Sequence, residues 1–290
     1  MKMKRNEKLG MLTGLVVGVL LLLISVFMIF QTTCKVWGAE KPANATQQGI
    51  DVSSHQGKID WEQVKNSALA DYAIIRCGYG VNQTDKDDKY WDYNSSECER
   101  LGIPYGTYLY SGADTTAKAR SEAEHVVRLL QGKNLTYPIY YDMEADMLNQ
   151  LSSTQIGNIA KTFLNTMESY GYKNVAVYSN KYLFETKLTA SVFSDYPKWI
   201  AQHSNKCTYR GSYHMWQYST QGVIPGISEK VDLNYKIGNW TYAGYSSAKK
   251  TVVVKPKATT IKSLKKSGKK AIKITYKKVS GVSGYQIYMS

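Results

Sequence analysis

Two carboxylates stand two positions apart in the segment Tyr140-Tyr141-Asp142-Met143-Glu144. Residues two apart on a β-strand point to the same side, and their Cα atoms lie about 6.6 Å apart along the chain. Two acids that flank one bond can hydrolyse a glycoside, since one protonates the leaving oxygen while the other stabilises or generates the attacking group. Most pairs with this spacing are only solvent-facing acids. A catalytic role is therefore predicted only if the pair ends an apolar strand of a barrel.

Other polar side chains follow predicted strands at the point where each strand ends. They are Asp51, Ser53, His55, Tyr79, Asp142, Glu144, His203 and Asp232. In a parallel barrel these ends meet at one mouth, which is the active site of barrel enzymes. Crowding Glu144 among the other acids is expected to raise its pKa and keep its proton available for donation near neutral pH.

Aromatic side chains accompany the acids, and Tyr outnumbers Phe by 24 to 5. Rings with an apolar face and a polar tip can stack on pyranose faces while offering hydrogen bonds. Of the neighbours Tyr140 and Tyr141, only one can face inward. We predict as substrate contacts Tyr79, Tyr108, Tyr110, Trp199, Gln202, Trp216 and Tyr218.

The elements that position these residues alternate between short β-branched or aromatic runs and amphipathic stretches. Strands are predicted at 49–52, 72–77, 105–110, 138–143, 175–178, 198–201, 214–218 and 230–233. Helices are predicted at 61–67, 90–101, 115–130, 154–170 and 181–188, the fourth opened by a capping box of Ser152 and Gln155.

The order of these elements predicts an α/β fold with parallel strands and helical crossovers. The last three predicted strands begin too close together for helices between them. The sequence therefore predicts a shortened TIM-like barrel, (β/α)5(β)3, in about 190 residues where the full barrel takes about 250.

Charge is distributed unevenly along the chain, which carries a net +14. Residues 1–41 carry a net +4, residues 241–290 carry +12 from twelve Lys and no acid, and residues 42–240 carry −2. An enzyme acting on nucleic acid would place its basic residues around the working surface, so this class is disfavoured. Residues 41–240 are predicted to form one near-neutral, monomeric globular domain.

The N-terminal segment 1–40 contains a nearly uncharged apolar run, 10–30, preceded by Lys2, Lys4, Arg5 and Lys8. A run of about 20 residues is long enough to span a bilayer, and the positive residues stay on the cytoplasmic side. Both a cleaved signal peptide and a membrane anchor fit this pattern. Either would place the rest of the chain outside the cell or in the wall.

The four cysteines show no C-x-x-C spacing, which disfavours a zinc ribbon. A disulfide between Cys77 and Cys98 is one interpretation for an exported chain. Two buried apolar thiols is the other.

The sequence resembles glycoside hydrolase family 25, the Chalaropsis-type lysozymes or N-acetylmuramidases. The resemblance runs from residue 48 to about residue 236. It rests on GIDVSSHQG at 49–57, IDW at 59–61, IRCGYG at 75–80, PYGTY at 104–108, YDME at 141–144, WIA at 199–201, WQY at 216–218 and VDLN at 231–234. Cys77 departs from the small residue that is more usual there, but no acid is lost.

This resemblance implies hydrolysis of the β-1,4 bond between N-acetylmuramic acid and N-acetylglucosamine in the glycan strands of peptidoglycan, without a metal or cofactor. It implies Glu144 as the general acid, Asp142 as its partner, and Asp51 and Asp232 as the remaining acids. It also implies a substrate-assisted route in which Asp142 orients the N-acetyl group of the sugar.

The C-terminal residues divide into a Lys-rich linker, 241–257, and a segment, 258–290, that resembles an incomplete fibronectin type III repeat. Strands are expected at 271–276 and within 279–288. The Lys side chains either hold anionic wall polymers or form a solvated charged run.

Two other function classes fit parts of this pattern. One is a barrel that binds peptidoglycan without catalysis, which the intact acid pair argues against. The other is a metal hydrolase such as a deacetylase, using Asp51, His55, Asp142 and His203, although no H-x-x-x-H spacing supports it.

Overall fold

The computed structural model describes residues 39–240, 260–267 and 271–277. The chain divides into two compact units, Met1–Ser247 and Ala248–Ser290. The predicted signal or anchor, the linker 241–257 and the strands within 279–288 lie outside the described residues. Among the residues that are described, no helix has both the length and the apolar character to cross a membrane.

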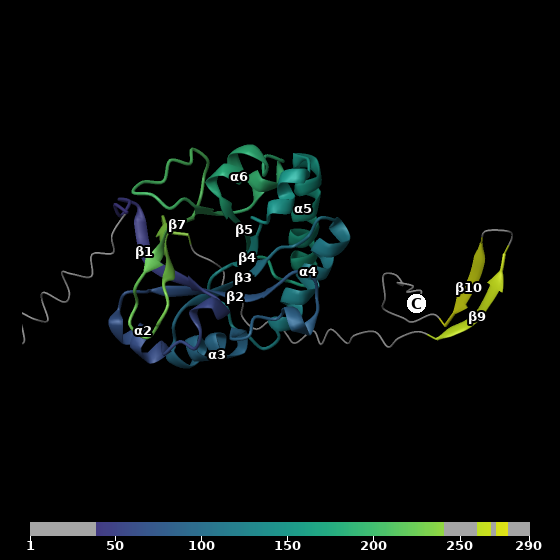
Figure 1. Cartoon of the computed structure of the whole chain (residues 1–290), viewed down its shortest axis with the longest axis horizontal. Helices are drawn as coiled ribbons and strands as arrows, with labels where there is room; N and C mark the ends of the chain where they lie inside the picture. Colours follow the sequence, from purple (N-terminus) through teal and green to yellow (C-terminus); the bar gives the residue numbers. More distant parts are fainter. Residues whose placement is uncertain (1–38, 241–259, 268–270, 278–290) are drawn as a thin grey trace, which may run out of the picture. The chain divides into compact units, whose positions relative to one another are not determined.

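The first unit is a closed barrel in which the eight strands neighbour one another in sequence order (Figure 1). The strands are β1 (Ala45–Val52), β2 (Tyr72–Tyr79), β3 (Tyr105–Tyr110), β4 (Ile139–Asp142), β5 (Val175–Asn180), β6 (Lys198–Ala201), β7 (Met215–Gly222) and β8 (Val231–Ile237). All eight overlap the predicted strands, and the barrel confirms the predicted fold class.

Strand direction changes only at β8. Strands β1 to β7 pair in parallel, whereas β8 is antiparallel to both β7 and β1. The short connection from β7 allows this reversal, because an antiparallel pair needs no crossover helix.

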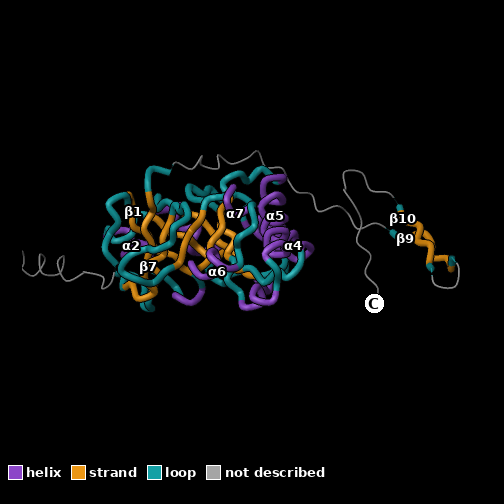
Figure 2. Tube along the Cα trace, turned by 90° about the horizontal axis from the view of Figure 1, so that it is seen from above, coloured by secondary structure: helices purple, strands orange, loops and turns teal. Residues whose placement is uncertain are grey.

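Helices lie outside the strands (Figure 2). They are α2 (Trp61–Ser67), α3 (Trp91–Leu101), α4 (Thr116–Leu129), α5 (Ser153–Ser169), α6 (Lys181–Thr186) and α7 (Val192–Asp195), with 3-10 turns η1 (Ser54–Gln56), η2 (Thr84–Lys86) and η3 (Asp146–Gln150). The predicted capping box of Ser152 and Gln155 is present, and α7 was not predicted.

Two apolar clusters fill the barrel and its surroundings. The inner cluster includes Tyr140, Tyr178 and Trp199. The ring centroid of Trp199 lies 4.9 Å from that of Tyr140 and 4.4 Å from that of Tyr178. The outer cluster lies between strands and helices and includes Tyr141, which stacks on Phe163 of α5 at 3.8 Å. Strand alternation thus sends Tyr140 inward and Tyr141 outward, as predicted for these neighbours.

The cysteines in the described part of the chain are free thiols. Cys77 and Cys98 are buried in the outer cluster, and Cys207 is partly buried. The disulfide interpretation is therefore wrong, and Cys77 and Cys98 act as small apolar side chains.

The second unit contains an antiparallel pair, β9 (Ile261–Lys266) and β10 (Ile272–Tyr276). The strand predicted at 271–276 is β10, whereas β9 was not predicted. Leu264 and Ile272 are largely exposed in this pair.

Candidate active site

The four predicted acids come together at the mouth of the barrel. Asp51 lies near the end of β1, Asp142 ends β4, and Glu144 follows two residues later. Asp232 is opposite Asp51 in the pairing of β1 with β8. Their charges influence one another's protonation, so three separate segments form one acidic site.

The position of Asp232 corrects one step of the sequence prediction. Asp232 was placed at the C-terminal end of a parallel eighth strand, but it is the second residue of β8, which extends to Ile237. Because β8 is antiparallel, its beginning reaches the same mouth as the ends of the parallel strands. The predicted direction of β8 and the predicted position of Asp232 within it were both wrong. Together these two errors still place Asp232 at the correct end of the barrel.

Asp51 and Asp232 lie in a dense hydrogen-bond network. Oδ2 of Asp51 accepts bonds from Asn234 Nδ2 at 2.7 Å and Gln217 Nε2 at 3.0 Å. Burial raises the pKa of Asp51 well above its usual value, and the charge of Asp232 adds to this. Burial also raises the pKa of Asp232 to about 6. The pair is therefore expected to retain a proton under mildly acidic conditions.

Asp142 is buried but poorly hydrogen-bonded. It is 2% exposed, and its Oδ1 has no hydrogen-bond partner among the described residues. Burial raises its pKa well above the usual value, the charges of Glu144 and Asp51 raise it further, and Arg76 lowers it. A buried polar atom without a partner is costly, so this oxygen is available for a donor on a ligand.

Glu144 has the electrostatic environment expected of a general acid. Burial raises its pKa, the charge of Asp51 raises it further, and His203 opposes the shift. Glu144 is partly buried, whereas Asp142 is fully buried. A raised pKa keeps the carboxyl protonated closer to neutral pH, which is what proton donation requires.

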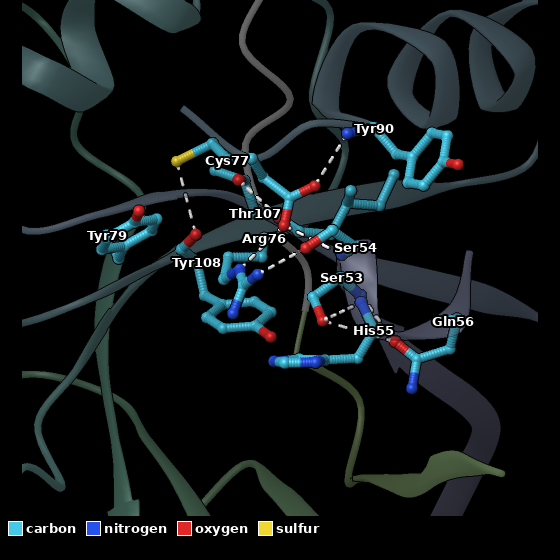
Figure 3. Close-up of polar contacts among 12 residues, drawn as sticks. Ser53, Ser54, His55, Gln56, Arg76, Cys77, Tyr79, Tyr90, Thr107 and Tyr108 are labelled. Atoms are coloured by element: carbon cyan, nitrogen blue, oxygen red, sulfur yellow. Dashed lines mark hydrogen bonds and ion pairs between the residues drawn. The ribbon is translucent and has the colours of Figure 1, made fainter. Parts of the chain in front are cut away.

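Arg76 is a site residue that the sequence analysis missed. It lies on β2, two and four residues after Ile74 and Tyr72, so that all three side chains point to the same side of the strand. Tyr72 and Ile74 belong to the inner cluster. Arg76 Nε donates to Asp88 at 2.8 Å and its Nη2 donates to Ser54 at 2.9 Å, as Figure 3 shows for Ser54. Strand alternation from Tyr72 would have placed this cation inside the barrel, where it counters the charge of Asp142.

Tyr108 and Tyr110 of β3 lie beside the acids. Burial raises the pKa of both phenols, and the charge of Asp142 contributes to both shifts. Tyr108 also packs edge-on against Trp199, with ring centroids 6.2 Å apart. Tyr79 at the end of β2 is 37% exposed, and Lys86 Nζ lies 5.0 Å from its ring centroid. These positions are compatible with the predicted sugar contacts.

The positions of Trp216 and Tyr218 do not fit the prediction that they contact substrate. Trp216 is 0% exposed and donates through Nε1 to the Gln202 carbonyl at 2.8 Å. Tyr218 stacks on Tyr235 at 4.4 Å, and both rings belong to the outer cluster. Proximity to a strand end suggested these rings, but the parity of β7 turns them away from the barrel interior.

Trp199 and Gln202 also have structural partners. Trp199 is buried in the inner cluster, where its Nε1 donates to Asn234 Oδ1 at 2.8 Å. The side chain of Gln202 bonds to Thr208 within the loop after β6. Trp199 therefore fixes the orientation of Asn234, which binds Asp51, and Gln202 stabilises the loop after β6.

The residues of the metal-hydrolase alternative do not form a metal centre. Asp51 is bonded to two amides, and His203 Nε2 lies 3.0 Å from Gln217 Oε1. Over the described ranges, no group of three or more His, Cys, Asp or Glu side chains is arranged to hold a metal ion. The histidines thus supply no ligand set for that alternative.

Further scaffolding holds the loops around the mouth. The buried carboxylate of Glu122 on α4 accepts bonds from Ser111 Oγ, Gly112 N and Tyr141 OH at 2.6–2.9 Å. This cluster joins the ends of β3 and β4. It fixes the backbone from which Tyr110 and Asp142 project.

A closed barrel with several carboxyls of raised pKa gathered at one mouth is the arrangement expected of a barrel glycosidase. The model of glycosyl hydrolases family 25 matches residues 50–227. The chain belongs to this family and is a glycoside hydrolase, which confirms the resemblance of its motifs.

Similar proteins share this region. An autolytic lysozyme of Clostridium acetobutylicum is 30% identical over 188 residues, which are 64% of this chain and 55% of that protein. The protein YegX of Escherichia coli K12 is 27% identical over 199 residues, 67% of this chain and 70% of that one.

A solved structure agrees with these sequence matches. The modular autolysin LytC of Streptococcus pneumoniae superposes with a TM-score of 0.60 at 33% identity, covering 65% of this chain and 46% of LytC. A second LytC structure, with a TM-score of 0.59, holds a synthetic peptidoglycan ligand. The chain thus spans about half the length of LytC and of the autolytic lysozyme.

Proposed function

We propose that this protein hydrolyses peptidoglycan as an N-acetylmuramidase, cleaving the β-1,4 bond between N-acetylmuramic acid and N-acetylglucosamine. Family membership supports glycoside hydrolysis. Likeness to an autolytic lysozyme, and to an autolysin that has been seen with a peptidoglycan ligand, supports the substrate class.

The unpaired Asp142 oxygen is the observation that carries the mechanism. Asp142 Oδ1 is buried beside a carboxyl with a raised pKa and has no donor within the described residues. A sugar acetamido N–H bound there would supply the missing donor. Asp142 would then orient the acetamido group, whose carbonyl oxygen attacks the anomeric carbon.

Glu144 has the role of general acid and then general base. It transfers its proton to the glycosidic oxygen as the C1–O bond breaks and the acetamido oxygen bonds to C1. A water molecule next attacks C1, the acetamido oxygen leaves, and the water's proton returns to Glu144. Atoms and charge balance over the cycle, and Asp142 stabilises the positive charge on the transient ring.

Clearing of a purified cell-wall suspension tests the activity, and mass spectrometry of the released ends tests the bond. Reducing muramic acid ends support the proposal, whereas reducing glucosamine ends identify a different bond. Glu144→Gln is the matched inactive variant. Equal clearing by wild type and variant would establish that Glu144 is not the acid and would leave a wall-binding barrel as the better account.

Location follows from the substrate. Peptidoglycan lies outside the membrane, so we propose that residues 10–30 export the barrel, either as a cleaved signal or as an anchor.

The β9–β10 pair contributes Lys262, Lys265, Lys266 and Lys273 and no acid. We propose that these cations hold anionic wall polymers, and loss of wall retention at high salt would test this attraction.

A further inference from the structure

Gln217 of β7 contacts two of the acids at the mouth of the barrel. It is the inward-facing residue between the outward rings of Trp216 and Tyr218, and it is 3% exposed. Its register partner on β8 is Asn234, the residue that also binds Asp51. Gln217 therefore lies where β7 and β8 deliver polar groups to β1.

The orientation of the Gln217 amide follows from its partners. Its Oε1 lies 3.0 Å from the hydroxyl of Tyr178 and 3.0 Å from Nε2 of His203. Its Nε2 donates to Asp51 Oδ2 at 3.0 Å and to Asp232 Oδ2 at 3.2 Å. The two acceptor sites and two hydrogens of the amide are all used, and a flipped amide would set its oxygen against two carboxylates.

Asn234 repeats this arrangement from the next strand. Trp199 Nε1, which can only donate, binds Asn234 Oδ1 at 2.8 Å, so the Asn234 amide nitrogen must face Asp51. Two oriented amides thus hold Asp51 from β7 and β8. Among the described residues, Gln217 alone donates to both Asp51 and Asp232.

Two neighbouring buried carboxyls are difficult to ionise together, and sharing one proton leaves the pair with a single negative charge. Donors fixed on both acids hold them in one geometry. The charge of Asp51 in turn helps to keep the proton on Glu144. The amide that fixes the pair can therefore influence the acid that does the chemistry without touching substrate.

We propose that Gln217 is a positioning residue that fixes Asp51 and Asp232 as one proton-sharing pair and links this pair to the loop after β6 through His203. This inference rests on the proposed function, because it assigns the pair a part in the same reaction. The titratable groups whose charges interact with the pair are Tyr108, Asp142, Glu144 and Tyr178; next to these, Arg76 acts on Asp142 and His203 binds the Gln217 amide.

The main test is the pH dependence of wall hydrolysis by Gln217→Glu. At the alkaline end of the pH profile, where the introduced carboxyl is ionised, it cannot donate to the pair, and kcat should fall about 100-fold with KM changed less than threefold. Near pH 5 the introduced carboxyl is protonated and donates one bond, so the loss should shrink to about tenfold. Gln217→Met has no donor, and its loss should persist at both pH values.

Gln221→Glu is the matched control, because it makes the same change at an exposed position of the same strand. It should keep the wild-type pH profile. Circular dichroism and the melting temperature at pH 5 establish that each variant is folded. A wild-type pH profile for folded Gln217→Glu would overturn the inference and leave Gln217 as a packing residue.

A readout independent of activity separates this inference from the proposed function. Carbon-13 NMR of the aspartate carboxyls should show Asp51 and Asp232 titrating as a coupled pair in wild type, with both titrations moved to higher pH in Gln217→Glu. If wild type shows this coupling but does not cleave peptidoglycan, the proposed function falls and the pair stands. If the titrations are unchanged in the variant, the inference falls even for an active enzyme.

Discussion

The mouth of the barrel holds two pairs of carboxyl groups whose hydrogen bonding differs. Asp51 and Asp232 receive fixed donors from Gln217 and Asn234, whereas Asp142 has a buried oxygen with no donor in the described part of the chain. Both pairs have raised pKa values, mainly because of burial. In the proposed mechanism, Asp142 and Glu144 perform the chemistry, while Asp51 and Asp232 influence the pKa values of these two acids.

The largest effect is expected at Glu144, where Glu144→Gln removes the donated proton and keeps the shape. We expect kcat on purified peptidoglycan to fall by about 10³-fold or more, in line with the loss of general acid catalysis. Glu229→Gln, a change of the same type at an exposed position, should retain full activity. A loss of less than tenfold at Glu144 would assign the acid role to another member of the cluster.

Asp142→Asn should reduce kcat by about 10²-fold to 10³-fold, because the amide cannot balance the positive charge that develops on the sugar. The same change removes a buried carboxylate with a raised pKa, so the melting temperature at pH 7 should rise. Activity and thermal unfolding measured on one preparation check both parts. A drop in both quantities would mean that Asp142 is structural.

Removing the cation beside Asp142 should change the pH dependence of the reaction. Arg76 lowers the pKa of Asp142, so in Arg76→Met the acidic limb of kcat/KM should move to higher pH and activity at pH 5 should fall about tenfold. Arg76→Lys keeps the charge and should keep the limb in place. Unchanged limbs in a folded Arg76→Met protein would remove Arg76 from the site.

The smallest effect concerns stability and the satisfied pair. The pKa of Asp232 rises from 3.8 to about 6 on folding, so its protonated form is favoured in the folded state. Its contribution to stability is therefore greatest below pH 4 and is lost as the pH rises to about 6. Asp232→Asn should flatten this dependence and stabilise the protein at pH 7 by about 1–3 kcal/mol, measured by urea unfolding.

A steeper fall in the stability of Asp232→Asn between pH 4 and 6 would contradict that prediction. It would show that Asp232 gains more from its hydrogen bonds than it loses by burial. The distinction between the two pairs would then rest on the unpaired oxygen of Asp142 alone.

Sequence patterns identified the barrel and the four acids, but they were less successful with the side chains around them. The alternation of strand-like and helix-like segments was sufficient for the fold, and α2 has the predicted bounds 61–67. Trp216 was chosen because it lies near a strand end, while its neighbour Gln217 was overlooked. On β7 the side chain of Gln217 points inward, whereas those of Trp216 and Tyr218 point outward. When both faces of a short aromatic strand are buried, the sequence does not reveal which residues point inward.

The amino-acid sequence by itself determined the order of the elements, the family and the types of residue available for catalysis, because these depend on local periodicity and motif spacing. Tertiary structure decided that β8 runs antiparallel, that Arg76 lies beside Asp142, and that Gln217 joins Asp51 to Asp232. Strand direction and register are set by pairing between segments that are far apart in the sequence, such as those of Asp51 and Asp232, which are 181 residues apart. Only closure of the barrel brings such segments into contact.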